Sequence, residues 1–124
     1  LRCAVTHMPS GTVMVTDAPL DNHGKGESFS PTDLVASALG TCIMTVMGIT
    51  ARKMAIDVSG STVVVKKTMV VKPARRIGEL AVVITVPHAL DEATKEKLVA
   101  AALSCPVHHS MHPDIAMPIE FRWA

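Results

Sequence analysis

The stretch SPTDLVASALGTCIMTVMGITARK, residues 30–53, decides the fold because it predicts one long helix in the middle of a short chain. Ser30 is a good N-terminal cap, and Pro31 suits the first helical position. Residues 34–51 carry no charge. We therefore expect a helix that runs to about Met54 and is buried on nearly all sides.

The same uncharged segment reaches the lower length limit for a helix that spans a membrane. It contains four Ser or Thr side chains and two glycines, Gly40 and Gly48, which disfavours a span. Each glycine costs roughly 1 kcal/mol of helix propensity relative to alanine. Close approach of another helix or strand would compensate for that cost. We expect a buried helix and no membrane partner.

The elements on both sides of this helix follow from residue periodicity and turn residues. We expect strands over residues 1–8, 12–17, 61–72, 79–87 and 116–123, and an amphipathic helix over residues 90–103 whose apolar side carries Leu98, Val99, Ala102 and Leu103. Residues 17–30 predict a polar loop, and SCPVHHSMHPD predicts a compact turn or short helix. The order β-β-α-β-β-α-β is typical of an α+β fold in which helices pack on antiparallel sheets.

The length of 124 residues predicts a single domain over residues 1–124. A long helix that is apolar all round is too large to be covered by so few strands in one small chain. We infer a homodimer in which the central helices of two subunits pack together.

Composition excludes several classes of function. The formal net charge of +1 provides no field for nucleic acid or anionic membrane. One Trp, two Phe and no Tyr provide few stacking platforms for single-stranded nucleic acid. Three cysteines without a signal-peptide pattern in LRCAVTHM predict a reducing, cytoplasmic compartment. Of these cysteines, Cys3 is expected to be a buried strand residue.

Two readings of Cys42, the lone cysteine of the long helix, compete. Free cysteine usually behaves as a small buried hydrophobe. The alternative is a reactive thiol in a dry pocket, which needs a positive partner because burial alone raises a thiol pKa.

Cys105 favours the second reading. It directly precedes Pro106, where a helix would begin, and amide donors at a helix start favour a thiolate. A cysteine in an apolar helix and another at a helix start suggest an attacking and a resolving thiol, although sequence alone does not show that they meet.

The rival reading of the second cysteine segment is a metal site. On a helix, Cys105, His108 and His112 would share one face, and sulfur with imidazole suits zinc. Pro113 and Pro106 leave only about one or two turns for such a helix, and a closed site normally draws ligands from two segments. The histidines can equally be packing or surface residues, and we expect no metal and no cofactor.

The chain resembles the OsmC/Ohr family in FSPTDLVASALGTCIMTVMGITARK, in the hairpin and amphipathic helix that follow, and in CPVHHSMHP. This resemblance implies an α+β, intertwined homodimer with the long helices at its centre and active sites at the subunit interface. It also implies a bacterial thiol-dependent peroxidase that acts on organic hydroperoxides and, less, on hydrogen peroxide.

By the same resemblance, Cys42 attacks the peroxide and becomes a sulfenic acid, and Cys105 resolves it as a disulfide. An external thiol or dithiol, of lipoyl type, then reduces the pair. In the family, an acidic residue directly follows the proline. That position is Thr32 in this chain, and the next residue, Asp33, is the acidic residue that takes its place. The family's hairpin arginine has no counterpart in THMPSGT, and Arg2 is the substitute by location. The alternative is a non-catalytic relative that binds a small apolar or thiol-reactive ligand.

Overall fold

The computed structural model describes residues 1–124. The chain forms two compact units, Leu1–Val35 and Ala36–Ala124. The single domain expected over residues 1–124 stays a prediction.

The first unit is a short hairpin followed by a loop. Strands β1 (Ala4–Thr6) and β2 (Val13–Val15) pair antiparallel, and the loop contains the short 3-10 helix η1 (Leu20–Asn22). The two strands are shorter than predicted and are exposed along their whole length. Cys3 is exposed just before β1, so its predicted burial in a strand is wrong.

Helix α1 (Pro31–Lys53) begins and ends where the sequence predicts. Two reciprocal hydrogen bonds define its start: the Asp33 N–H donates to Ser30 Oγ at 3.1 Å, and the Ser30 N–H donates to Asp33 Oδ2 at 2.9 Å. This is a capping box, with aspartate in the place of the usual glutamate. The predicted helix start is confirmed.

The expected burial of α1 on nearly all sides is wrong within one chain. One stripe of the helix is buried, formed by Ala36, Leu39, Gly40, Ile43, Met47 and Ala51. Ile49 is 51% exposed. The helix has the length and apolar composition of a membrane span, but the core helices of soluble proteins have them too.

Gly40 lets α1 approach the sheet. A methyl group placed on its Cα would lie 2.9 Å from Val65 Cγ2 and 3.4 Å from Val63 Cγ1. The glycine therefore costs helix propensity but permits a close contact between α1 and a strand.

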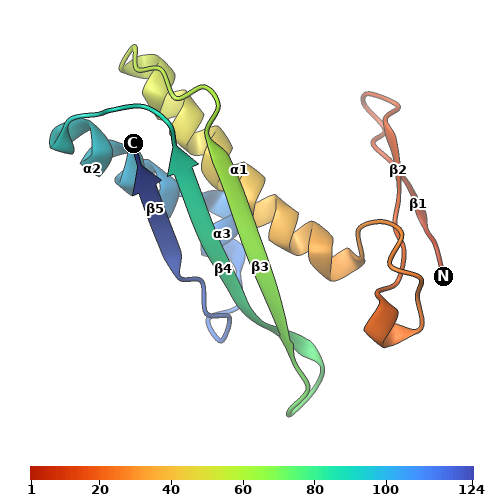
Figure 1. The fold of residues 1–124 in the computed structure, drawn as a ribbon. Helices are drawn as coiled ribbons and strands as arrows, with labels where there is room; N and C mark the ends of the chain where they lie inside the picture. The colour runs from red at the N-terminus through yellow and green to blue at the C-terminus, as the bar shows by residue number, and fades with distance from the viewer. The chain divides into compact units, whose positions relative to one another are not determined.

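The sheet of the second unit has the order β3-β4-β5, with β3 at Thr62–Val70, β4 at Arg76–Val86 and β5 at Ile119–Trp123. Strands β3 and β4 form the predicted hairpin, and β4 begins earlier than expected because Arg76 and Ile77 pair with β3 beyond a register shift. The three strands lie side by side in Figure 1.

The expectation of antiparallel sheets is wrong for the last strand, because β5 runs parallel to β4. Between them the chain passes through α2 (Glu92–Leu103) and α3 (Pro106–Ser110). A crossover through helices returns the chain to the starting end of the sheet, so the next strand pairs parallel. The sheet is mixed, and the fold remains α+β.

Helices α1, α2 and α3 lie on one side of this sheet (Figure 1), and the core is formed between them. Its fully buried side chains are Leu39 and Ile43 from α1, Leu80, Val82, Ile84 and Val86 from β4, and Leu98 from α2. The buried face of α2 differs from the predicted one. Thr94 and Ala101 are buried beside Leu98 and Ala102, whereas Leu103 is 48% exposed.

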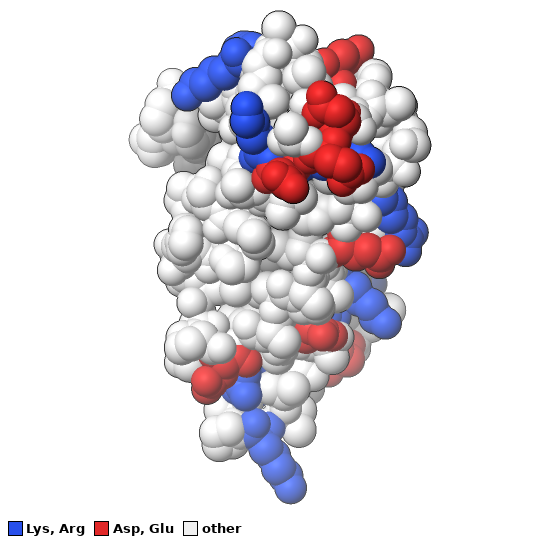
Figure 2. All heavy atoms as spheres, turned by 90° about the vertical axis from the view of Figure 1, so that its left-hand side faces the viewer, with Lys and Arg blue, Asp and Glu red and all other residues white.

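Acidic and basic side chains are interspersed on the face of the molecule shown in Figure 2. This mixture agrees with the small net charge of the sequence. On this face there is no broad field of one sign for a nucleic acid.

Candidate functional site

Cys42 lies at the edge of the buried stripe of α1. The next residue, Ile43, is fully buried, and the preceding residue, Thr41, is exposed. Cys42 itself is half-buried. Cys42 therefore lies at the boundary between the core and the surface of this chain.

Cys105 is fully buried at the junction of α2 and α3. It has an extended backbone because a residue before proline is disfavoured from helical geometry. Pro106 then begins α3, and the Cys105 sulfur accepts a hydrogen bond from the His108 N–H at 3.4 Å. The Cys-Pro sequence thus turns the cysteine into the N-terminal cap of the short helix.

The structure brings the two cysteines together. Cys42 lies close enough to Cys105 to influence the Cys105 thiol, and both are free thiols. Burial raises the pKa of the Cys105 thiol, and the neighbouring Cys42 thiol raises it further. The backbone N–H groups of His108 and Val107 lower it by donating to the sulfur.

Two adjacent free thiols can exchange two electrons with a partner by forming a disulfide. Their exposures differ, since Cys105 is fully buried and Cys42 is half-buried. An oxidant from solvent therefore meets Cys42 first.

Arg2 is held by two carboxylates of the first unit. Its Nη2 donates to Glu27 Oε2 at 2.6 Å and lies 3.9 Å from Asp17 Oδ2. The hydrogen bond to Glu27 is the largest cause that raises the pKa of Arg2. Glu27 is a member of the polar loop, which the sequence predicted.

Asp17 is the buried centre of this loop. Its side chain is 2% exposed and accepts the Glu27 N–H at 3.1 Å. That amide hydrogen bond is the first cause that lowers the pKa of Asp17. Sequence reasoning did not single out Asp17, although an aspartate between a strand and a glycine-bearing loop is a common turn signal.

Asp33 takes part in the capping box at the start of α1. Its carboxylate accepts the Ser30 N–H, and it lies nine positions before Cys42 on the same helix. A catalytic role of Asp33 stays a prediction.

The structure does not place Cys105, His108 and His112 on one helical face, as the metal hypothesis requires. Helix α3 ends at Ser110, so His112 does not continue the helical face of Cys105 and His108. His112 Nδ1 instead accepts the Asp114 N–H at 3.1 Å. No three His, Cys, Asp or Glu side chains in residues 1–124 are grouped so that they could hold one ion.

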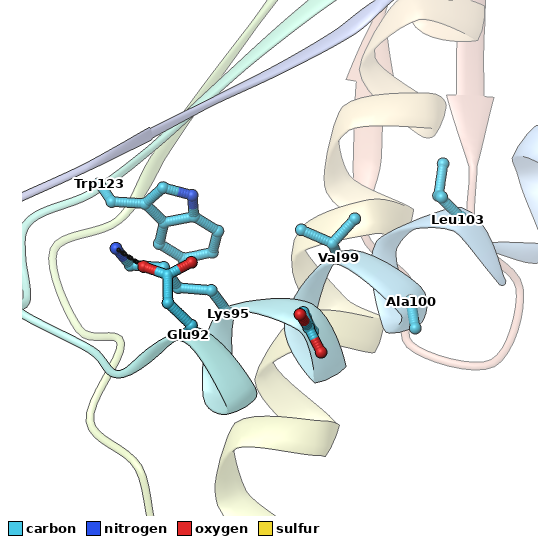
Figure 3. A pocket seen from close by; sticks show the side chains of 7 residues that line it. Glu92, Lys95, Val99, Ala100, Leu103 and Trp123 are labelled. Carbon is cyan, nitrogen blue, oxygen red and sulfur yellow. Dashed lines mark hydrogen bonds and ion pairs between the residues drawn. The ribbon is translucent and has the colours of Figure 1, made fainter.

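A groove of about 440 Å³ on the outer side of α2 was not predicted. Figure 3 shows the Trp123 indole of β5 beside Lys95 and Glu92 of α2, with Val99 and Leu103 further along the helix. Lys95 Nζ lies 5.9 Å from the centre of the Trp123 ring and 3.1 Å from Glu92 Oε1. None of the predicted site residues lines this groove.

Comparisons with known proteins agree on one family. The family pattern described as OsmC-like protein matches residues 24–120. No protein with a curated function matches the chain.

Solved structures resemble the chain over nearly its whole length. A candidate osmotic-stress-induced and detoxification response protein from Psychrobacter arcticus is 45% identical, with 98% of this chain and 88% of that chain covered and a TM-score of 0.92. An organic hydroperoxide resistance protein OsmC from Legionella pneumophila is 17% identical, with 98% and 95% covered and a TM-score of 0.72.

A third structure is a candidate organic hydroperoxide resistance protein from Vibrio cholerae with captopril bound in one of its active sites. It is 15% identical, with 95% of this chain and 82% of that chain covered and a TM-score of 0.76. At these low identities the second and third likenesses show the fold.

Proposed function

This chain belongs to the OsmC-like protein family, and from that premise we propose that it is a thiol-dependent peroxidase that reduces organic hydroperoxides. The observation that supports the proposal is the pair of free, neighbouring thiols, Cys42 and Cys105. Family relatives described as organic hydroperoxide resistance proteins support a peroxidase-like role.

The reaction begins at Cys42. Its thiolate attacks the terminal oxygen of the hydroperoxide, an S–O bond forms, and the O–O bond breaks. The leaving alkoxide takes a proton and departs as the alcohol. Cys42 is then a sulfenic acid, and the peroxide has accepted two electrons.

Cys105 completes the turnover. Its thiolate attacks the Cys42 sulfur, an S–S bond forms, and hydroxide leaves and is protonated to water. A cytoplasmic dithiol of lipoyl type then reduces the disulfide by two successive thiol exchanges and becomes a disulfide itself. The nearness of the two thiols supports the formation of this disulfide.

The substrate class follows from the surroundings of Cys42. No residue from 34 to 51 is charged, and Leu39 and Ile43 beside Cys42 belong to the apolar core. An apolar hydroperoxide gains more from such a surface than hydrogen peroxide does. Arg2 as the cation and Asp33 as the acid that support the thiolate are the parts of the proposal that rest on the family resemblance.

A homodimer is part of the same proposal. The face of α1 that the sheet leaves uncovered carries Ala38, Thr41, Thr45, Gly48 and Ile49. A methyl group on Gly48 would meet nothing within 4 Å in this chain, so no contact within the chain requires the glycine. Packing of a second α1 against this face would explain both the glycine and the exposed Ile49.

The test is anaerobic addition of one equivalent of cumene hydroperoxide to the reduced protein, followed by intact-mass and peptide analysis. We expect loss of two hydrogen atoms and a peptide that links Cys42 to Cys105. The matched controls are Cys42→Ser, which should not form the link, and Cys3→Ser, which should form it normally. An unchanged mass in the reduced wild-type protein after excess peroxide would refute the proposed function.

A further inference from the structure

The basic side chains are unevenly distributed along the chain. Residues 58–78 contain no Asp or Glu and five of the twelve Lys and Arg residues, namely Lys66, Lys67, Lys72, Arg75 and Arg76. This segment carries +5 and the whole chain +1, so the remaining residues together carry −4. The expectation of no membrane partner used the net charge, which averages over this distribution.

Three of these cations lie at the turn of the β3–β4 hairpin. Residues 71–75 connect the two strands, and all five are exposed. Lys72 and Arg75 belong to this turn, and Arg76 is the first residue of β4. In Figure 1 the turn projects beyond α3 and β5, which belong to the same unit. The turn is therefore a projecting, basic end of the second unit.

The same turn exposes apolar side chains among its cations. Val71 is 68% exposed, and Pro73 and Ala74 are exposed too. Segments that lie on a membrane surface combine apolar side chains, which enter the boundary between headgroups and acyl chains, with Lys and Arg, which attract anionic lipids. The hairpin turn has both components.

We propose that the β3–β4 turn, residues 71–76, docks on an anionic lipid surface. Val71 enters the headgroup region, and Lys72, Arg75 and Arg76 contact the lipid phosphates. Each Lys or Arg near such a surface raises the partition coefficient about fivefold. Three cations and one valine therefore give weak, reversible binding.

The composition of the hairpin favours lipid over other polyanions. Residues 58–78 contain no aromatic side chain, so they have no stacking platform for the bases of a single-stranded nucleic acid. An acidic protein would need a pocket of the right shape for Val71, whereas a headgroup region accepts any small apolar side chain. Glu79, the first acidic residue after the turn, pairs with Thr68 further back on the hairpin. The basic surface is thus confined to the projecting end.

One consequence of docking rests on the proposed function. Apolar hydroperoxides partition into lipid, so a peroxidase held at a lipid surface is close to its substrate. The docking itself involves neither Cys42 nor Cys105. Its test uses no peroxide, so failure to bind lipid and failure to link the two cysteines are separate results.

The experiment measures sedimentation of the purified protein with vesicles of equal parts phosphatidylglycerol and phosphatidylcholine, at about 0.01 and 0.15 M salt. Vesicles of phosphatidylcholine alone are the control for lipid charge. We expect binding to the anionic vesicles at low salt, and binding weaker by about tenfold or more at the higher salt, because salt screens exposed charges. Absence of binding to the anionic vesicles at low salt, or equal binding to the neutral ones, would overturn the proposal.

A matched pair of double variants separates the turn from the net charge. Lys72→Gln/Arg75→Gln should lower the partition coefficient about 25-fold, fivefold for each cation. The control, Lys53→Gln/Lys97→Gln, removes two exposed cations outside the hairpin and should bind like wild type. All four side chains are exposed, and circular dichroism checks that both variants are folded. An equal loss in the two variants would contradict docking through the turn.

Val71→Ser tests the apolar contact. We expect it to lower the partition coefficient about threefold or more, because the valine no longer leaves water. Vesicle binding equal to that of wild type would contradict the insertion of Val71. Tighter binding of the wild-type protein to polyglutamate-coated beads than to the anionic vesicles would identify an acidic polypeptide as the partner and overturn the lipid proposal.

Discussion

At the scale of single residues, the site depends on which neighbour each polar atom has. Cys42 has a thiol neighbour, and Cys105 has that thiol and two amides. The sequence placed one cysteine in an apolar helix and the other before a proline, which suggested two kinds of thiol. It could not show that they are neighbours, because 62 residues and three further elements lie between them.

Asp17 gives a prediction about acid stability. Its folded pKa is lowered from the ordinary value of 3.8, first by the Glu27 amide hydrogen bond. A lowered folded pKa stabilises the folded chain above pH 3.8, and this contribution is lost as the pH falls through the folded pKa. We expect the melting temperature to fall below about pH 4, and Asp17→Asn to be less stable than wild type at pH 6.

The measurement is thermal unfolding by circular dichroism between pH 2 and 7 for wild type, Asp17→Asn and Glu96→Gln. The difference between wild type and Asp17→Asn should shrink as the solution becomes acidic, since the wild-type carboxyl is then protonated too. Glu96 is an exposed carboxylate of α2, so the melting temperature of Glu96→Gln should equal that of wild type at each pH. A constant difference at every pH would contradict the assigned role of the Asp17 charge.

Residue-level prediction from sequence succeeded where the signal is local. Ser30 and Pro31 mark the start of α1 as expected, because capping depends on neighbours in the chain. The pairing of Arg2 with Glu27 and the burial of Asp17 depend on how a loop folds back. No periodicity in the sequence carries that information.

At the scale of elements, Gly40 decides how closely α1 packs on β3. Alanine would gain about 1 kcal/mol of helix propensity. Its methyl group would lie 2.9 Å from Val65 Cγ2, and such overpacking typically costs about 1–3 kcal/mol. We expect Gly40→Ala to lower the free energy of unfolding by about 1 kcal/mol, measured by urea denaturation.

A double-mutant cycle with Val65→Ala tests the cause. Removing the Val65 methyl groups also removes the clash, so Gly40→Ala should become neutral or stabilising in that background. The same cost in both backgrounds would mean that another contact opposes the methyl group.

The element order was predictable, and the direction of β5 was not. Alternating residues and turn signals located the strands, but they are the same for parallel and antiparallel pairing. The parallel pairing of β4 with β5 follows from the path of the chain through α2 and α3. The predicted apolar side of α2 was wrong in part. Leu103 and Val99 line a surface groove instead of the core.

At the scale of the whole molecule, the burial of α1 is incomplete in one chain. Only one stripe of the helix is covered, yet residues 34–51 carry no charge on any side. Ile49 is 51% exposed, which is unusual for a side chain in so apolar a helix. The absence of charge predicted a helix buried on nearly all sides. A second subunit that covers the exposed face of α1 would account for it.

Ile49→Arg tests this proposed dimer. In a two-fold symmetric interface one substitution acts twice, so two arginines would be buried against an apolar surface. We expect the dissociation constant of the dimer to rise about a hundredfold or more, as measured by sedimentation equilibrium. The control is Val64→Arg, at a side chain that is 64% exposed on β3 and outside the proposed interface. It should leave the association unchanged. An Ile49→Arg protein that associates as tightly as Val64→Arg would contradict the packing of two α1 helices. A wild-type protein that is monomeric at micromolar concentration would refute the dimer itself.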